Sequence, residues 1–233
     1  MDAEELLWGV PGSPRRGPRP ALSRDGIVRA GIQIADDDGF AALSMQRVAA
    51  RLGAATMSLY RHVPGKNELV SLMLDAAIGG PPPAAEDAGW RTAVAEWARG
   101  TRDIFVRHPW TLPLVTGART MGPNELAWTE AALRVLVTTG LPGPALLDVL
   151  LLVNGYVRGA AADFTGGPRV PGRESLLRFG RLDRYPVFAT VFQEASAADT
   201  PASEAERFEF GLARVLDGVE LFVQAHGGPA DPA

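Results

Sequence analysis

The sequence contains no cysteine and only one lysine among its 23 basic residues. The absence of cysteine excludes a disulfide framework, a thiolate metal site and a cysteine nucleophile, and it fits a reducing compartment. The three histidines, His62, His108 and His226, lack the spacing of metal ligands. We therefore expect no metal site and no cofactor.

Long apolar runs are also scarce. The longest, residues 145–153, is interrupted by Asp148 and is far shorter than the ~18 residues of a membrane-spanning helix. The first five residues are acidic, where a signal peptide would be basic. We expect a soluble, cytoplasmic protein that does not engage a membrane.

Signals for strands and for catalysis are few. Helical periodicity runs through most of the chain from Ser23 onwards, so we predict an all-α fold. Among the predicted helices, one ends near Asp38-Gly39, one covers 124–139 and one opens at Ser203 with a sequence close to a capping box, whereas the stretch from 174 to 195 is less regular. The sequence has no Gly-x-Ser-x-Gly, no phosphate loop and no His-Glu-x-x-His, and we predict that the protein is not an enzyme. The acidic run 36–38 is interpreted as a solvated helix end rather than a metal site.

The net charge of −4 hides a segregation of charge along the chain. Residues 23–66 carry +2, whereas residues 67–233 carry −6. Between Phe40 and Lys66 there are four basic residues and no acidic one. A surface that binds nucleic acid would therefore lie in this window.

Breaks in the helical pattern divide the chain into three parts. Residues 9–20 combine proline and glycine with arginine, so they cannot donate a regular ladder of hydrogen bonds. Residues 79–83, Gly-Gly-Pro-Pro-Pro, mark a hinge or boundary. We predict a flexible basic arm over 1–22, a three-helix helix-turn-helix domain over 23–70 and a larger helical domain over 71–233.

Residues 44–63 have the pattern of a helix-turn-helix. Two short helices are predicted, over 45–52 and 56–62, with Gly53 at the break. Ala49 is small where the helices would cross, and Gly53 permits the tight turn. Because such a spacing also occurs by chance in helical domains, it is the acid-free window around it that favours DNA binding.

At this point the chain resembles a known family. Residues 23–78, above all 42–49 and 58–69, are similar to the DNA-binding domain of the tetracycline-repressor (TetR) family, and His108-Pro109-Trp110 with the apolar helix 142–164 resembles the C-terminal domain of its founding member. The resemblance implies a one-component transcriptional regulator and a homodimer on a palindromic double-stranded DNA operator. It also implies a larger domain for dimerisation and ligand binding. A repressor that a small apolar effector releases from the operator is the default of this family.

The resemblance also implies which side chains contact DNA. The side chains expected to contact base edges are those of Gln46, Thr56, Met57 and Ser58. Those expected to contact phosphates are Ser44, Tyr60, His62 and Lys66. Glutamine can pair bidentately with adenine, whereas phosphate contacts fix the register without specifying sequence. Arg61 is suited to guanine or to phosphate, and this choice stays open. The alternative for Tyr60 is partial burial against the first helix.

Candidates for the ligand cavity come from the helices that enclose it in the family. In an apolar helix, Asn154 and Arg158 form an i, i+4 pair that needs polar partners, either in a cavity or in a dimer seam. For the aromatic candidates, ordinary core packing is the alternative. The full set is Trp97, Phe105, Trp110, Leu114, Met121, Trp128, Asn154, Arg158 and Phe164.

Two further expectations concern the ends of the chain. The last helix, about 203–225, and the 142–164 helix have the most apolar faces, which a four-helix dimer seam would bury. Arg15, Arg16 and Arg19 suit a minor groove, but a solvated tail has the same composition. The alternative to a regulator is a helical enzyme or interaction module without DNA binding.

Overall fold

The computed structural model of the chain describes residues 3–9, 22–82, 89–164, 178, 184–196 and 203–227. Helices account for all regular structure in these segments, and the fold is all-α as predicted. The arginines of the predicted arm lie outside the described residues, as does the side chain of Phe164.

The first group of helices forms what we call the head. It contains α2 (Arg24–Asp38), the short η1 (Phe40–Ala42), α3 (Met45–Arg51), α4 (Thr56–Leu59) and α5 (Lys66–Ile78). The Ser23 hydroxyl caps α2 by accepting a hydrogen bond from the Gly26 amide. The predicted end of this helix is confirmed, because Gly39 follows with a φ of 83°.

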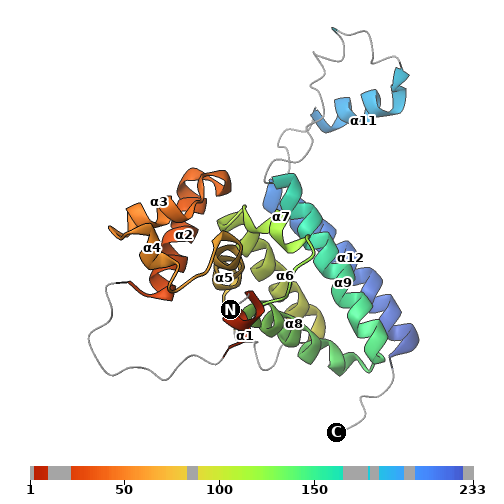
Figure 1. Cartoon of the computed structure of the whole chain (residues 1–233). Helices are drawn as coiled ribbons and strands as arrows, with labels where there is room; N and C mark the ends of the chain where they lie inside the picture. Colours follow the sequence, from red (N-terminus) through yellow and green to blue (C-terminus); the bar gives the residue numbers. More distant parts are fainter. Residues whose placement is uncertain are drawn as a thin grey trace.

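The second group forms the body. It contains α6 (Trp90–Arg107), α7 (Thr111–Val115), α8 (Pro123–Leu136), η2 (Val137–Thr139), α9 (Gly143–Phe164) and α12 (Glu204–His226). Ser203 and Glu206 make the capping box of α12. Figure 1 shows α9 and α12 side by side along one edge of the body. The helix predicted over 124–139 is confirmed, although its last turn is the tighter η2.

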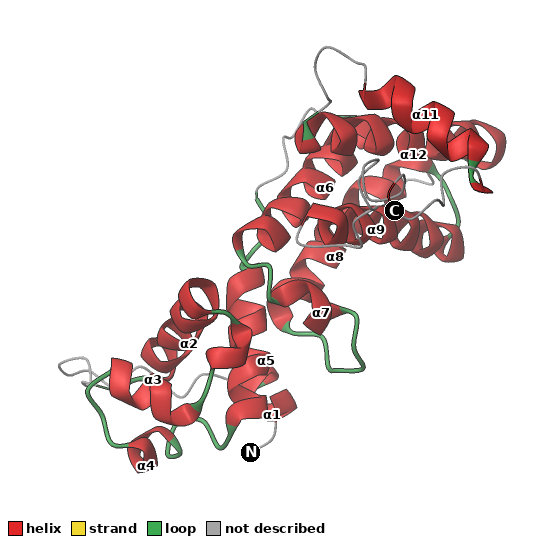
Figure 2. Ribbon diagram, turned by 90° about the horizontal axis from the view of Figure 1, so that it is seen from above, coloured by secondary structure: helices red, strands yellow, loops and turns green. Residues whose placement is uncertain are grey.

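Two apolar cores lie within this arrangement, and α5 contributes to both. Leu69 and Met73 belong to the head core, whereas Leu74 belongs to the body core. Figure 2 shows α5 between the other head helices and the body. One helix therefore carries side chains of both cores. The predicted boundary between residues 70 and 71 falls inside α5 and stays a prediction.

Two helices were not predicted from the sequence. The short α1 (Ala3–Trp8) packs against α5 through Leu6, which is 4% exposed. The second, α11 (Pro186–Ser196), lies in a stretch that we expected to be irregular.

Among the described residues, one helix segment, Gly143–Asp163, is long and apolar enough to cross a membrane. The sequence expectation that no segment reaches this length was therefore too strict. The core helix of a soluble protein passes the same test, and α9 packs against α6, α8 and α12.

Candidate DNA-binding surface and ligand cavity

The turn between α3 and α4 lies at Gly53 as predicted, but α4 ends at Leu59 rather than at residue 62, and residues 60–62 form a turn. The Ser44 hydroxyl accepts a hydrogen bond from the Arg47 amide and so caps α3. After α3 the chain turns at Gly53, whose φ is 61°, and the Ala54 amide donates back to the Ala49 carbonyl. Beneath the turn, Val48 and Leu59 are fully buried. The two helices are thus held rigidly over the head core.

All nine predicted DNA-contact residues retain accessible surface. Met57 is 73% exposed and Tyr60 is 41% exposed, so the alternative of partial burial for Tyr60 stays open. The remaining side chains divide into an exposed and a half-buried group: Gln46, Arg61 and Lys66 are exposed, and Ser44, Thr56, Ser58 and His62 are half-buried. The predicted surface is therefore available to a partner.

The acidic run at the end of α2 neutralises part of the positive charge of the head. Arg47 pairs with Asp38 at 2.8 Å, and Arg51 pairs with Asp37 at 2.8 Å. The run ends α2 and is exposed, as predicted, and the basic residues of α3 lie directly beside it. In the part of the chain that the structure describes, Arg61 and Lys66 have no acidic partner and keep their charge for a ligand.

The third acid, Asp36, joins the head to the body. It accepts a hydrogen bond from the Trp110 indole at 2.7 Å, and the His108 ring nitrogen lies 2.9 Å from it. Trp110 is 6% exposed and stacks on Phe40, with 6.1 Å between ring centroids. Lys66 in turn lies over the Phe40 ring. A continuous set of contacts therefore runs from the body to a predicted phosphate contact.

Two candidates for the ligand cavity were placed wrongly. Trp110 belongs to the head core, where its indole N–H donates to the carboxylate of Asp36. Leu114 packs between the two cores and does not line the cavity.

The body contains a cavity of about 290 Å³ between α6, α8 and α9. Trp97 and Trp128 form one wall with their rings edge to face, 6.3 Å between centroids. Six of the nine predicted ligand residues line this cavity, namely Trp97, Phe105, Met121, Trp128, Asn154 and Arg158. Trp97, Phe105 and Trp128 are also buried members of the body core, so the alternative of ordinary core packing stays open for them.

Polar groups in the cavity fall into two sets. The Trp97 indole donates to the Trp128 carbonyl at 2.8 Å, and the Trp128 indole donates to the Gly79 carbonyl at 2.9 Å. By contrast, Asn154 Oδ1 and Arg158 Nε are buried and have no hydrogen-bond partner within the described residues. Unpaired buried polar groups cost about 1–3 kcal/mol each, so each of these two atoms lacks the compensation that a polar partner would give.

Sequence reasoning missed a second polar edge of the cavity. Glu125 lines it and pairs with Arg119 at 2.7 Å, and Thr129 lies one turn further along α8. The i, i+4 spacing places both on one face, but the same spacing is common on solvated helices. Beside them, Asp75 of α5 accepts hydrogen bonds from Asn124, and burial raises the pKa of Asp75. The other lining residues missed are Ile78, Thr101, Ile104, Val115, Leu147, Leu150 and Leu151.

With this geometry established, comparison with known proteins assigns the class. The family model described as "Bacterial regulatory proteins, tetR family" matches residues 27–73, and "Tetracyclin repressor-like, C-terminal domain" matches residues 82–223. The chain belongs to the TetR family and is a DNA-binding transcriptional regulator.

Individual proteins of this family are similar to the chain over most of its length. The chain is 39% identical to the HTH-type transcriptional repressor DrrR1 of Streptomyces coeruleorubidus, over 98% of this chain and 88% of that protein. The structure of ActR from Streptomyces coelicolor in complex with actinorhodin matches with a TM-score of 0.67 and 27% identity, over 92% of this chain and all of the other. Apo ActR matches with a TM-score of 0.73 at 24% identity, covering 89% and 99% of the two chains.

Proposed function

We propose that this regulator is a repressor and that a small aromatic molecule in the α6–α8–α9 cavity releases it from its operator. The observation that carries the proposal is the pair of buried polar atoms without partners among the described residues, Asn154 Oδ1 and Arg158 Nε, in a cavity whose walls are mainly apolar and aromatic. Such a site suits a flat apolar molecule with one or two polar groups.

The names and titles of similar proteins also support a repressor that responds to a ligand. DrrR1 is named a repressor, and the ActR structure contains actinorhodin. The continuous contacts from α6 through Trp110 to Asp36 and Phe40 give a physical route by which the cavity affects the head. A ligand that prefers one of two head positions lowers DNA affinity by about 1–3 kcal/mol for typical coupling.

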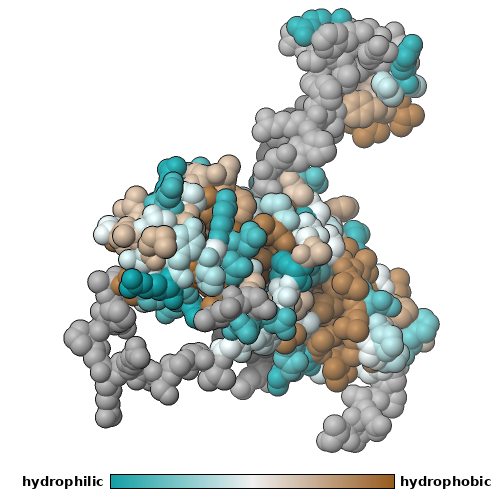
Figure 3. All heavy atoms as spheres, viewed as in Figure 1, coloured by the Kyte–Doolittle hydropathy of each residue, from teal (hydrophilic) through white to brown (hydrophobic). Residues whose placement is uncertain are grey.

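We also propose a homodimer on a palindromic double-stranded DNA operator. Leu151 and Leu152 of α9 and Phe210 and Leu221 of α12 are more than half exposed. Figure 3 shows apolar surface gathered over the region of these two helices. A two-fold axis through an α9–α12 seam would bury it, and a two-fold dimer reads two inverted half-sites. A protein with this task works in the cytoplasm and needs no membrane.

We propose that the nine head residues contact DNA in two ways, at base edges and at phosphates. Gln46, Thr56, Met57 and Ser58 contact base edges, whereas Ser44, Tyr60, His62 and Lys66 hold phosphates. The oxygen of Ser44 already caps α3, so its phosphate contact would use the hydroxyl as donor. Arg61 has no acidic partner among the described residues and supplies charge to either kind of contact.

The effector proposal is tested with operator DNA selected from a random pool and with actinorhodin as the first of a panel of polycyclic aromatic probes. In wild-type protein, binding of an active probe lowers operator affinity measured by fluorescence anisotropy. Asn154→Leu keeps the branched shape of the side chain and removes the unpaired acceptor, so we expect unchanged operator affinity and about 10-fold weaker probe binding.

The matched control is Arg134→Gln on the outer face of α8, where the arginine side chain is 74% exposed. This variant should respond like wild type. A probe that occupies the cavity and leaves operator affinity unchanged would contradict the proposal, and so would an unaltered response in Asn154→Leu.

A further inference from the structure

The N-terminal helix α1 lies outside both family-matched regions and yet contacts the rim of the cavity. It packs on α5 through the buried Leu6. At its end, the Trp8 indole nitrogen donates a hydrogen bond to the Met121 carbonyl, 3.0 Å away and 113 residues later in the chain. An element of six residues is marginal on its own, so its position depends on these two contacts.

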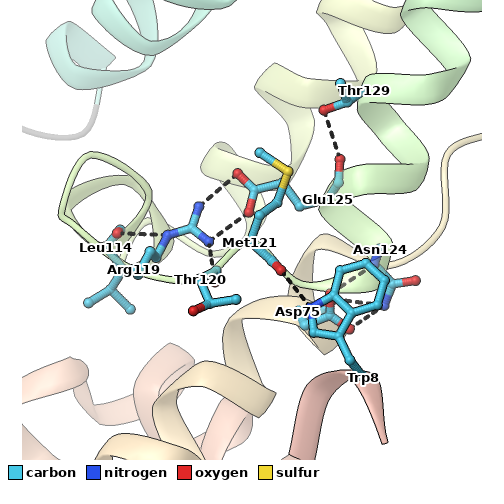
Figure 4. A network of polar contacts seen from close by, with 9 residues as sticks. All are labelled: Trp8, Asp75, Leu114, Arg119, Thr120, Met121, Asn124, Glu125 and Thr129. Carbon is cyan, nitrogen blue, oxygen red and sulfur yellow. Dashed lines mark hydrogen bonds and ion pairs between the residues drawn. The ribbon is translucent and has the colours of Figure 1, made fainter. Parts of the chain in front are cut away.

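Met121 marks one exposed side of the cavity; on another side Leu147 and Leu151 of α9 also line it and are 51% and 66% exposed. The Met121 side chain lines the cavity and is also 41% exposed to solvent. Figure 4 shows Met121 between Trp8 on one side and Glu125 on the other. A molecule that enters past this side chain must therefore displace the segment that Trp8 holds.

The loop 116–122 is fixed firmly on either side of Met121. Arg119 donates to the Leu114 carbonyl at 3.2 Å and pairs with Glu125 at 2.7 Å, so it connects α7 to α8. Just beyond the loop, Asn124 is bound to Asp75 of α5 by hydrogen bonds of 2.9 Å. Within the described residues, the hydrogen bond from Trp8 is the one that holds the Met121 backbone.

We propose that Trp8 is a positioning residue of the effector cavity, because α1 holds the Met121 segment closed over this side of the cavity and thereby sets how fast small molecules enter and leave there. The inference rests on the proposed effector cavity and deepens it. Its mechanism is local: removing one hydrogen bond raises the population of the open loop without changing the inner walls, which Trp97, Trp128 and Asn154 form.

The absence of cysteine provides a direct assay. Thr101 lines the cavity and is 9% exposed, so Thr101→Cys introduces one thiol whose reaction rate with dithiobisnitrobenzoate reports access. Trp8→Phe in this background keeps the ring and removes the donor. We expect its reaction to be about 3- to 10-fold faster, the range of one net hydrogen bond. Leu6→Ala should accelerate it at least as much, because it undocks α1.

Two controls separate a positioning role from general loosening. Glu4→Gln changes an exposed residue of the same helix and should leave the rate unchanged. Thr139→Cys places the thiol in a different buried part of the body, 6% exposed and outside the cavity lining, where Trp8→Phe should have no effect.

Equal rates in Trp8→Phe and its Thr101→Cys parent would overturn the proposal, and so would equal acceleration at both thiol positions. The assay uses neither DNA nor an effector. Its outcome is therefore distinguishable from a failure of the repressor proposal, which would appear as unchanged operator affinity in the presence of a bound probe.

Discussion

The head and the body are both helical, but they differ in how their interiors are used. In the head, Ile27, Val48 and Leu59 are completely buried in one filled core, and the polar side chains face outward. In the body, aromatic side chains enclose a cavity, and Asn154 Oδ1 and Arg158 Nε in its lining have no hydrogen-bond partner among the described residues. A surface that recognises DNA needs rigid support, whereas a sensor needs space that a second molecule can fill.

The largest effect that separates the two regions is expected from Leu59→Ala. Truncating this fully buried side chain leaves a hole under the turn and should cost about 2–5 kcal/mol of head stability. Operator binding should be lost, while quenching of the cavity tryptophans by a bound probe persists. Thermal unfolding followed by circular dichroism and tryptophan fluorescence checks this result. Loss of probe binding as well would mean that the two cores do not act separately.

A second variant weakens the joint between the regions. Trp110→Phe keeps the stacking on Phe40 and removes the hydrogen bond to Asp36, a charged acceptor, which is worth about 1.5–3 kcal/mol. We expect lower stability in urea and a smaller difference between probe affinities of free and operator-bound protein. A stability loss without any change in that difference would show that the coupling runs elsewhere.

A third variant acts on the charge of the head surface. Lys66→Ala removes an exposed cation with no acidic partner among the described residues, so binding to every DNA sequence should weaken. The slope of log affinity against log salt should fall by about 1. Arg134→Gln also removes one positive charge, but from the body, and therefore serves as the control. An unaltered salt slope would remove Lys66 from the DNA-binding surface.

The smallest expected effect is the loss of stability on breaking an ion pair within the body, between Arg99 and Glu209. The hydrogen bond from Arg99 holds the pKa of Glu209 below its ordinary value. A lowered pKa contributes stability above the unfolded pKa, and this contribution is lost as the pH falls through the folded one. Because the pair is exposed, Glu209→Gln should cost under about 1 kcal/mol at pH 7. Urea titrations should show this difference disappearing in acid; a constant difference would contradict the assignment.

The sequence could predict the elements whose stability is local. The Ser203–Glu206 capping box and the glycine at residue 39 were predicted because their signals lie within a few residues. By contrast, α1 depends on the packing of Leu6 against α5 and on a bond to Met121, and neither contact leaves a periodic signal in six residues. Tertiary contacts of this kind are invisible to pattern analysis.

The same distinction applies to the functional residues. The family resemblance placed the DNA-contact candidates on an accessible surface, because the motif is short and contiguous. It misplaced Trp110, whose hydrogen-bond acceptor is 74 residues away. Glu125 and Thr129 were missed because an acid near the start of a helix is ordinary. The unpaired atoms of Asn154 and Arg158 were anticipated as needing partners, but only the structure shows that they lie in the cavity.

The most direct test of the account is a selection of bound sequences from a random duplex DNA pool, carried out in parallel with wild-type protein and Gln46→Ala. Gln46 is exposed on α3 and suited to a single adenine. We predict an inverted repeat for wild type and the same repeat for the variant, with preference relaxed by about 1–3 kcal/mol at one base pair in each half-site. No enriched sequence with wild type, or identical preferences for the two proteins, would contradict the claim that the head reads DNA through this surface.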